Sequence, residues 1–161
     1  MKLSFLLCLL GLMPTYAKPS CDEQRMQQLA SDSNIVVVAN IIEVGPPPKV
    51  WSGLFLFVQR VRYEVKDVLK GQVSKREINV GHYIVKNCLS ADSKEARLSP
   101  DVFKKGNQLL LFLASDPGKG KYVSLETPAK DNDYVVSDSN CGAVLAEENT
   151  LKSIRQTLHG R

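Results

Sequence analysis

Residues 54–71, LFLFVQRVRYEVKDVLKG, decide the fold that this sequence predicts. From Phe57 onward apolar and charged side chains alternate with a period of two, which is typical of a half-buried β-strand. At about 3.3 Å per residue, fifteen residues span roughly 50 Å, which is too long for a flat strand in a small domain, so we expect it to bend across two sheets. One face carries Val61, Tyr63 and Val65, and the other carries Arg60, Arg62, Glu64 and Lys66.

The segments on either side of this stretch predict further short strands and two helices. Met26, Leu29 and Ala30 have helical spacing within residues 22–32, and Leu151, Ile154 and Leu158 have it within residues 144–159. Strands rich in β-branched or other apolar residues are expected at 34–44, 76–83, 107–114, 121–126 and 133–137.

Two residues of the predicted strand at 76–83 (REINVGHY) receive specific expectations. Gly81 is expected to form a β-bulge, and His82 is expected at an ordinary surface position.

The whole pattern predicts a mainly β protein. The expected architecture is a small closed or nearly closed OB-type β-barrel with a short N-terminal helix and a C-terminal helix.

The first 17 residues predict a secretory signal peptide. Lys2 precedes an apolar run, residues 3–12, and the small residues Thr15 and Ala17 precede the expected cleavage point. The run is shorter than the roughly 20 apolar residues that cross a bilayer, and we expect no membrane span elsewhere. Residues 18–161 are therefore expected to form a single domain of an exported protein, either secreted to the extracellular space or held in a bacterial periplasm.

The charge of the chain argues against nucleic acid as a partner. The full sequence has a formal net charge of +4, and loss of Lys2 with the signal leaves +3. No basic cluster is denser than Lys104-Lys105 or Lys119-Gly-Lys121, whereas binding through counterion release needs a concentrated patch.

Three cysteines remain after removal of the signal: Cys21, Cys88 and Cys141. In an oxidising compartment two of them are expected to pair and one to be left over. No cysteine or histidine lies within four residues of another, so the spacing typical of zinc sites is absent, and we expect no metal and no cofactor.

The sequence also lacks residues spaced as a catalytic site would require. An enzyme of the hydrolytic classes needs a nucleophile beside a base, or a pair of carboxylates. His82 is expected on the surface, and His159 lies three residues from the end of the chain, where fraying is common. The sequence therefore predicts a protein that is not an enzyme and has no catalytic residues.

The connection that precedes the long strand is the predicted binding element. Residues 45–53, GPPPKVWSG, contain three prolines that stiffen the backbone, together with the only tryptophan of the chain. Trp51 either covers one end of the barrel or is presented to a partner as an aromatic anchor. In the second interpretation the Pro46–Phe55 loop contacts a protein through Pro47, Val50, Trp51, Leu54 and Phe55.

Taken together, these elements resemble the netrin-like OB-fold superfamily. The most specific pieces are Tyr63-Glu64-Val65-Lys66 running into Leu69-Lys70-Gly71, and the positions of the three cysteines. The superfamily includes the tissue inhibitors of metalloproteinases, and the amino-terminal domain of agrin looks similar; the resemblance covers residues 21–158. It implies a binding module whose protein partner is a protease or a matrix or envelope protein.

The resemblance also implies a disulfide from Cys21 to the cysteine after the third strand, Cys88. Cys21 with Cys141 is the alternative, because in the inhibitors two amino-terminal cysteines bond to both positions and this chain has only one.

Two other functions follow from the resemblance and the fold class. A metalloprotease inhibitor of this superfamily chelates zinc through the free α-amino group of a first-residue cysteine. Cleavage after Ala17 leaves Lys18-Pro19-Ser20 ahead of Cys21, and the resulting amide nitrogen cannot bind zinc, so this function is disfavoured. A binder of oligonucleotides or oligosaccharides is the other alternative, because many OB folds have that role.

Overall fold

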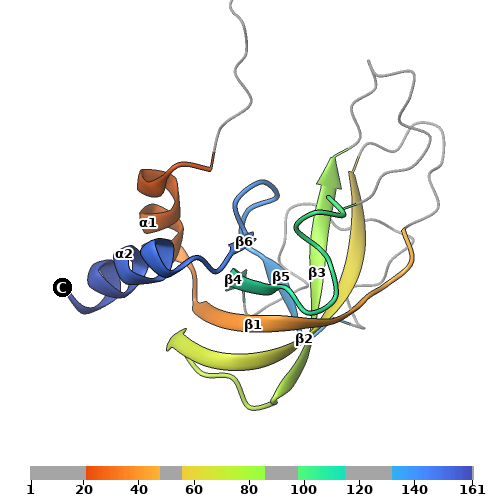
Figure 1. The fold of residues 1–161 in the computed structure, drawn as a ribbon, viewed down its shortest axis with the longest axis horizontal. Helices are drawn as coiled ribbons and strands as arrows, with labels where there is room; N and C mark the ends of the chain where they lie inside the picture. Colours follow the sequence, from red (N-terminus) through yellow and green to blue (C-terminus); the bar gives the residue numbers. More distant parts are fainter. Residues whose placement is uncertain (1–20, 48–55, 86–97, 115–131, 161) are drawn as a thin grey trace, which may run out of the picture.

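The computed structural model describes residues 21–47, 56–85, 98–114 and 132–160. In this part of the chain six strands lie between two helices, which confirms the mainly β class (Figure 1). The elements are α1 (Glu23–Asp32), β1 (Ile35–Val44), β2 (Leu56–Lys70), β3 (Glu77–Val85), β4 (Gln108–Ala114), β5 (Tyr134–Val136), β6 (Ala143–Leu145) and α2 (Glu148–His159).

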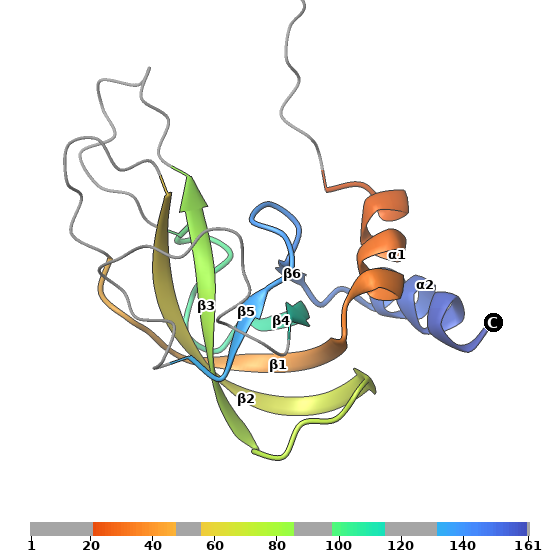
Figure 2. The same cartoon turned by 180° about the vertical axis from the view of Figure 1, so that it is seen from behind.

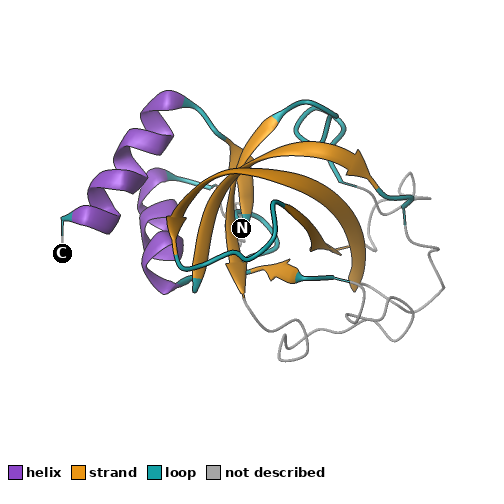
Figure 3. Cartoon of the chain, turned by 90° about the horizontal axis from the view of Figure 1, so that it is seen from below, coloured by secondary structure: helices purple, strands orange, loops and turns teal. Residues whose placement is uncertain are grey.

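The long strand β2 has two different neighbours along its length. Its first half, 56–64, pairs with β3, and its second half, 61–70, pairs with β1, both in antiparallel register. Three register shifts between β1 and β2 accompany the curvature, which Figure 3 shows as strands bending around a common axis. The prediction of a long strand within residues 54–71 is confirmed, but both of its pairings belong to one closed sheet and not to the two sheets expected.

The remaining pairings close the barrel. β1 pairs with β4 from Ile35↔Leu113 to Asn40↔Gln108, while β5 lies between β3 and β4. The ring β1-β2-β3-β5-β4-β1 is therefore a closed five-stranded barrel, and β6 adds to β4 outside the ring. The β3–β5 pairing is parallel and all others are antiparallel, so the predicted OB-type barrel with a helix at each end is confirmed.

Two hydrophobic cores explain why β1 and β4 are apolar on both faces. The inner core fills the barrel, whereas the outer core lies between the barrel and the two helices (Figures 1 and 2). Alternate residues of each strand face opposite cores, as the pleat of a strand requires. The inner core takes Ile35, Val37, Ala39, Leu109, Leu111 and Leu113, and the outer core takes Val36, Val38, Leu110, Phe112, Leu29 and Ile154.

The helices are attached by apolar and polar contacts. Asp22 caps α1, accepting a hydrogen bond of 2.8 Å from the Arg25 amide, as expected for an aspartate at this position. At the other end of α1 the Lys70 ammonium donates to the carbonyls of Ala30 and Ser31 at 3.0 and 2.7 Å. The last strand residue of β2 thus satisfies carbonyls that the helix leaves without intrahelical partners.

Two expectations about secondary structure are wrong. The C-terminal helix was expected from Val144, but residues 143–145 form β6, because their backbone pairs with β4 before α2 begins at Glu148. Gly81 forms no bulge; it pairs regularly with Arg60. Its lack of a side chain serves packing instead, since a Cβ there would lie 2.9 Å from Asn132 Nδ2 and from Val58 Cγ1. The strand expected at 121–126 lies outside the described residues.

Truncation inside the barrel is expected to cost much more stability than truncation at its edge. Leu111→Ala removes a fully buried side chain of the inner core and should lower the free energy of unfolding by about 2–5 kcal/mol, measured by urea denaturation. Leu145→Ala on β6, where the side chain is 41% exposed, is the matched control and should cost less than about 1 kcal/mol. Equal costs at the two positions would contradict the assignment of the inner core.

Candidate functional site

The predicted binding loop starts from a fixed position on the barrel. The Gly45 amide donates a 2.8 Å hydrogen bond to the Arg60 carbonyl, which extends the β1–β2 pairing to the first residue of the loop. Pro46 and Pro47 follow with exposed side chains. The other predicted contact residues, Val50, Trp51, Leu54 and Phe55, lie outside the described residues.

An open hollow of about 350 Å³ lies at the foot of this loop, on the outer face of β1, β2 and β3. Gly45 and Pro46 form its side toward the loop, and the rest is polar or charged. Its lining consists of Glu43, Gly45, Pro46, Arg60, Arg62 and Asn79. We call these six residues the loop-foot hollow.

The charges around the loop-foot hollow are arranged in pairs. The Arg62 guanidinium lies 2.9 Å from the Glu43 carboxylate and 3.8 Å from that of Glu77. Further along β2, Glu64 pairs with Lys66 at 2.6 Å and with Arg76 at 2.7 Å. Hydrogen bonds from these two cations lower the pKa of the Glu64 carboxyl. The face is therefore charged but mixed in sign, as the alternation in the sequence predicted.

Polar groups inside the barrel support the base of the loop. The Gln59 side chain is buried; its Nε2 donates to the Gly45 carbonyl at 2.8 Å, and its Oε1 accepts from the Leu98 amide at 3.1 Å. One side chain thus joins the start of the loop to the segment that precedes β4. Because a buried amide without partners is costly, these two bonds fix the position of Gly45.

His82 is buried, which corrects the expected surface position. Its side chain is 3% exposed, and its Nε2 lies 2.8 Å from the Tyr63 hydroxyl inside the barrel. The ring also contacts Phe103 edge-on, with the ring centroids 4.9 Å apart. Burial lowers the pKa of His82 to about 3 and raises that of Tyr63, so both groups are neutral near pH 7.

The sequence contains a pattern that predicts the inward position of His82. Ile78, Val80 and Ile84 alternate in the third strand, and His82 has the same parity, so it belongs to the inward face. The expected surface position was inferred from the neighbours of His82 and not from the period of the strand. Gln59 was missed in the same way, because it has the parity of Val61 and Tyr63 on β2.

The structure brings together one of the two cysteine pairs considered. Cys21 precedes α1 and Cys141 lies in the turn between β5 and β6; both are free thiols, and both pack in the outer core. Cys88, the partner that the resemblance implies for Cys21, lies outside the described residues.

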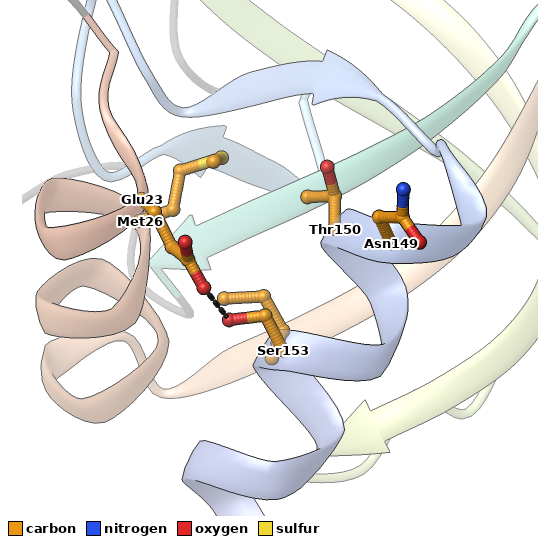
Figure 4. Close-up of a pocket in the computed structure, with 6 residues that line it drawn as sticks. Glu23, Met26, Asn149, Thr150 and Ser153 are labelled. Carbon is orange, nitrogen blue, oxygen red and sulfur yellow. Dashed lines mark hydrogen bonds between the residues drawn. The ribbon is translucent and has the colours of Figure 1, made fainter.

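A second, smaller hollow of about 190 Å³ lies between the helices. Figure 4 shows Glu23 and Met26 of α1 facing Asn149, Thr150 and Ser153 of α2. The Ser153 hydroxyl bonds the Glu23 carboxylate and also accepts from Gln27 Nε2 at 3.0 Å. These bonds hold the two helices together. The residues that line this hollow include no pair of charged side chains placed as a catalytic site would require.

Within residues 21–47, 56–85, 98–114 and 132–160, no three His, Cys, Asp or Glu side chains are grouped so that they could hold a metal ion. Over the same ranges no helix has the length and apolar character needed to cross a bilayer.

The chain matches no protein-family model and none of the curated proteins.

The burial of His82 is expected to make folding sensitive to mild acid. Its pKa is about 3 in the folded protein and about 6.5 in an unfolded chain, so the stability it contributes is complete above pH 6.5 and is lost as the pH falls toward 3. The slope reaches about 1.4 kcal/mol per pH unit.

Urea unfolding of the wild type and of His82→Gln between pH 7 and pH 5 measures this contribution. The glutamine amide replaces Nε2 beside Tyr63 but does not titrate, so the difference in stability between the two proteins should shrink as the pH falls. His159→Gln, at an exposed position, is the control and should follow the wild type. A constant difference between wild type and His82→Gln would show that His82 titrates normally.

Proposed function

We propose that this chain is a non-enzymatic binding module of the netrin-like, TIMP-like class that contacts a protein partner through the Pro46–Phe55 loop and the loop-foot hollow. The observation that carries the proposal is the hollow itself: an open, charged depression directly beside exposed prolines, on strands that the barrel holds in place. Binding residues on loops that a rigid scaffold positions are a common arrangement.

The two parts of this surface have complementary roles. The loop contains Trp51 and Phe55, and large aromatic side chains supply much of the energy at protein interfaces. The hollow supplies paired charges of both signs, which suit the polar rim of an interface. Prolines reduce the freedom that the loop loses on binding, so the contact costs less entropy.

Several features support a protein partner over nucleic acid. Glu43 and Glu77 neutralise Arg62, and Glu64 lies between Lys66 and Arg76. Acidic groups among the arginines of this outer face would repel phosphates, so the face is poorly suited to a polyanion. The partner is, on this proposal, a protease or a matrix or envelope protein.

The compartment and domain limits belong to the same proposal. A signal peptide at residues 1–17 directs export, and residues 18–161 form one netrin-like domain outside the cell or in a periplasm. Zinc chelation by Cys21 stays the weaker proposal, because it requires processing up to Ser20 so that Cys21 becomes the first residue.

Site-specific photocrosslinking tests the proposed surface. A benzophenone amino acid is placed at Pro47 beside the hollow or, as the control, at the exposed Lys152 of α2. Irradiation in the exported compartment should link a defined protein to position 47 and not to position 152. Equal labelling from both positions would contradict the proposal.

A matched pair of arginine substitutions tests the contribution of the hollow to the same contact. Arg62 and Arg155 have similarly exposed side chains, and both pair with carboxylates. Arg62→Ala should reduce the crosslink yield at position 47 about fivefold, the loss expected for a charge at the rim of an interface, whereas Arg155→Ala should leave it unchanged. An unchanged yield with Arg62→Ala would remove the hollow from the interface.

A further inference from the structure

Two cysteines that are 120 positions apart in the sequence meet where α1 joins the barrel. Cys21 directly precedes the capping residue Asp22, and Cys141 lies in the turn between β5 and β6 with 2% of its surface exposed. Both are free thiols in the structure; Cys141 belongs to the outer core and Cys21 packs against it.

Contacts that do not involve the thiols hold both positions. Arg25 of α1 bonds the Asp138 carboxylate at 2.7 Å through its guanidinium, and its amide donates to Asp22 at 2.8 Å. The same Asp138 accepts hydrogen bonds from the amides of Asn140 and Cys141, each at 2.8 Å. Arg25 and Asp138 therefore bring the start of α1 to the turn that contains Cys141.

The turn itself requires a residue without a side chain after Cys141. A Cβ on Gly142 would lie 2.3 Å from the Asp138 carbonyl and 2.6 Å from Val136 Cβ. The backbone around Cys141 is consequently tight, and its side chain is held in the outer core facing Cys21.

The surroundings of the pair suit a structural bond and not a reactive thiol. Burial, and after it the hydrogen bond with Cys141, raises the pKa of Cys21 to about 12, and burial raises that of Cys141. Thiolate is therefore scarce at neutral pH, and thiolate is the form that attacks disulfides or binds metals. Within the described ranges no third metal-ligating side chain joins these cysteines.

We propose that Cys21 and Cys141 form a disulfide that fastens α1 to the β5–β6 turn. The proposal favours the alternative pairing of the sequence analysis over the pairing of Cys21 with Cys88. It rests on the packing of both side chains in the outer core and on the Arg25–Asp138 contact beside them, and not on the proposed binding function.

The bond would form by exchange with a donor disulfide, such as oxidised glutathione or an oxidised dithiol oxidoreductase. One cysteine, as thiolate, attacks the donor and displaces one of its sulfurs as a thiolate. The second cysteine, also deprotonated, then attacks the mixed disulfide and releases the other donor sulfur. The two cysteines are oxidised, the donor is reduced to two thiols, and the two protons that the cysteines lose go to the released thiolates.

This thiol–disulfide exchange should occur before α1 packs against the barrel. In the folded chain Cys141 is buried and thiolate is scarce, so both formation and reduction of the bond should be slow. Once formed, the bond joins the start of α1 to the turn that precedes β6.

Non-reducing peptide mapping tests the pairing directly, because trypsin separates the three cysteines. The full chain is exported from a host with an oxidising compartment, its free thiols are alkylated in denaturant, and it is digested. Cys21, Cys88 and Cys141 fall in peptides that end at Arg25, Lys94 and Lys152. We expect the first and third peptides to be linked and the second to be alkylated. A Cys21–Cys88 link, or alkylation at all three positions, would overturn the proposal.

Thermal unfolding with and without a phosphine reductant provides a second readout. A link across 120 residues should raise the Tm by roughly 10–15 °C, so prolonged reduction should lower the Tm of the wild type by that amount. Cys88→Ala should show the same reductant-dependent shift, whereas Cys21→Ala and Cys141→Ala should show none.

The double variant Cys21→Ala/Cys141→Ala separates the bond from the packing of the side chains. Without reductant it should lose little more Tm than either single variant, because each single substitution already removes the link. If the losses of the single variants add, or if only Cys88→Ala abolishes the effect of the reductant, the proposed pair is wrong.

Discussion

The backbone hydrogen bonds of β2 are the constraint on which the rest of this structure depends. A strand of fifteen residues exposes more donors and acceptors than one neighbour can satisfy, and β2 solves this by pairing first with β3 and then with β1. The two pairings point in different directions, so the sheet must curl (Figure 3). Because the sheet curls, the free edge of β1 reaches β4 and pairs with it. This pairing closes the ring and leaves β1 with a neighbour on both sides.

The closed barrel has the two helices at one end and the loop-foot hollow at the other, and different side chains are buried at the two ends. β1 begins next to the helices and ends at the loop-foot hollow, so the ten residues of this strand connect the two regions (Figure 1). The helical end contains the outer core with the two cysteines. The other end contains two buried polar contacts: Gln59 joins Gly45 to Leu98, and Tyr63 contacts His82. A rigid support of this kind is what a projecting binding loop needs.

Much of the fold could be predicted from the sequence because strand periodicity is a local signal. The long strand, the apolar strands β1 and β4, and helix α1 follow from the spacing of apolar residues. Residues 143–145 could not be assigned in this way, because three residues carry no period and their strand exists only through pairing with β4. The surface position expected for His82 was wrong because its neighbours, and not its parity in the strand, were used to place it. The packing of Cys21 and Cys141 in one core depends on the path of the whole chain, which no spacing in the sequence reveals.

Cross-strand nuclear Overhauser effects test barrel closure most directly, because closure requires β1 to have neighbours on both sides. In an isotope-labelled sample, backbone contacts should connect Val38 with Leu110 across the β1–β4 pairing. Further contacts should connect Ala39 with Val65, and Val61 with Val80, along the two pairings of β2. Detection of all three sets is the predicted result. Contacts for both β2 pairings without any between β1 and β4 would show an open sheet and contradict the account.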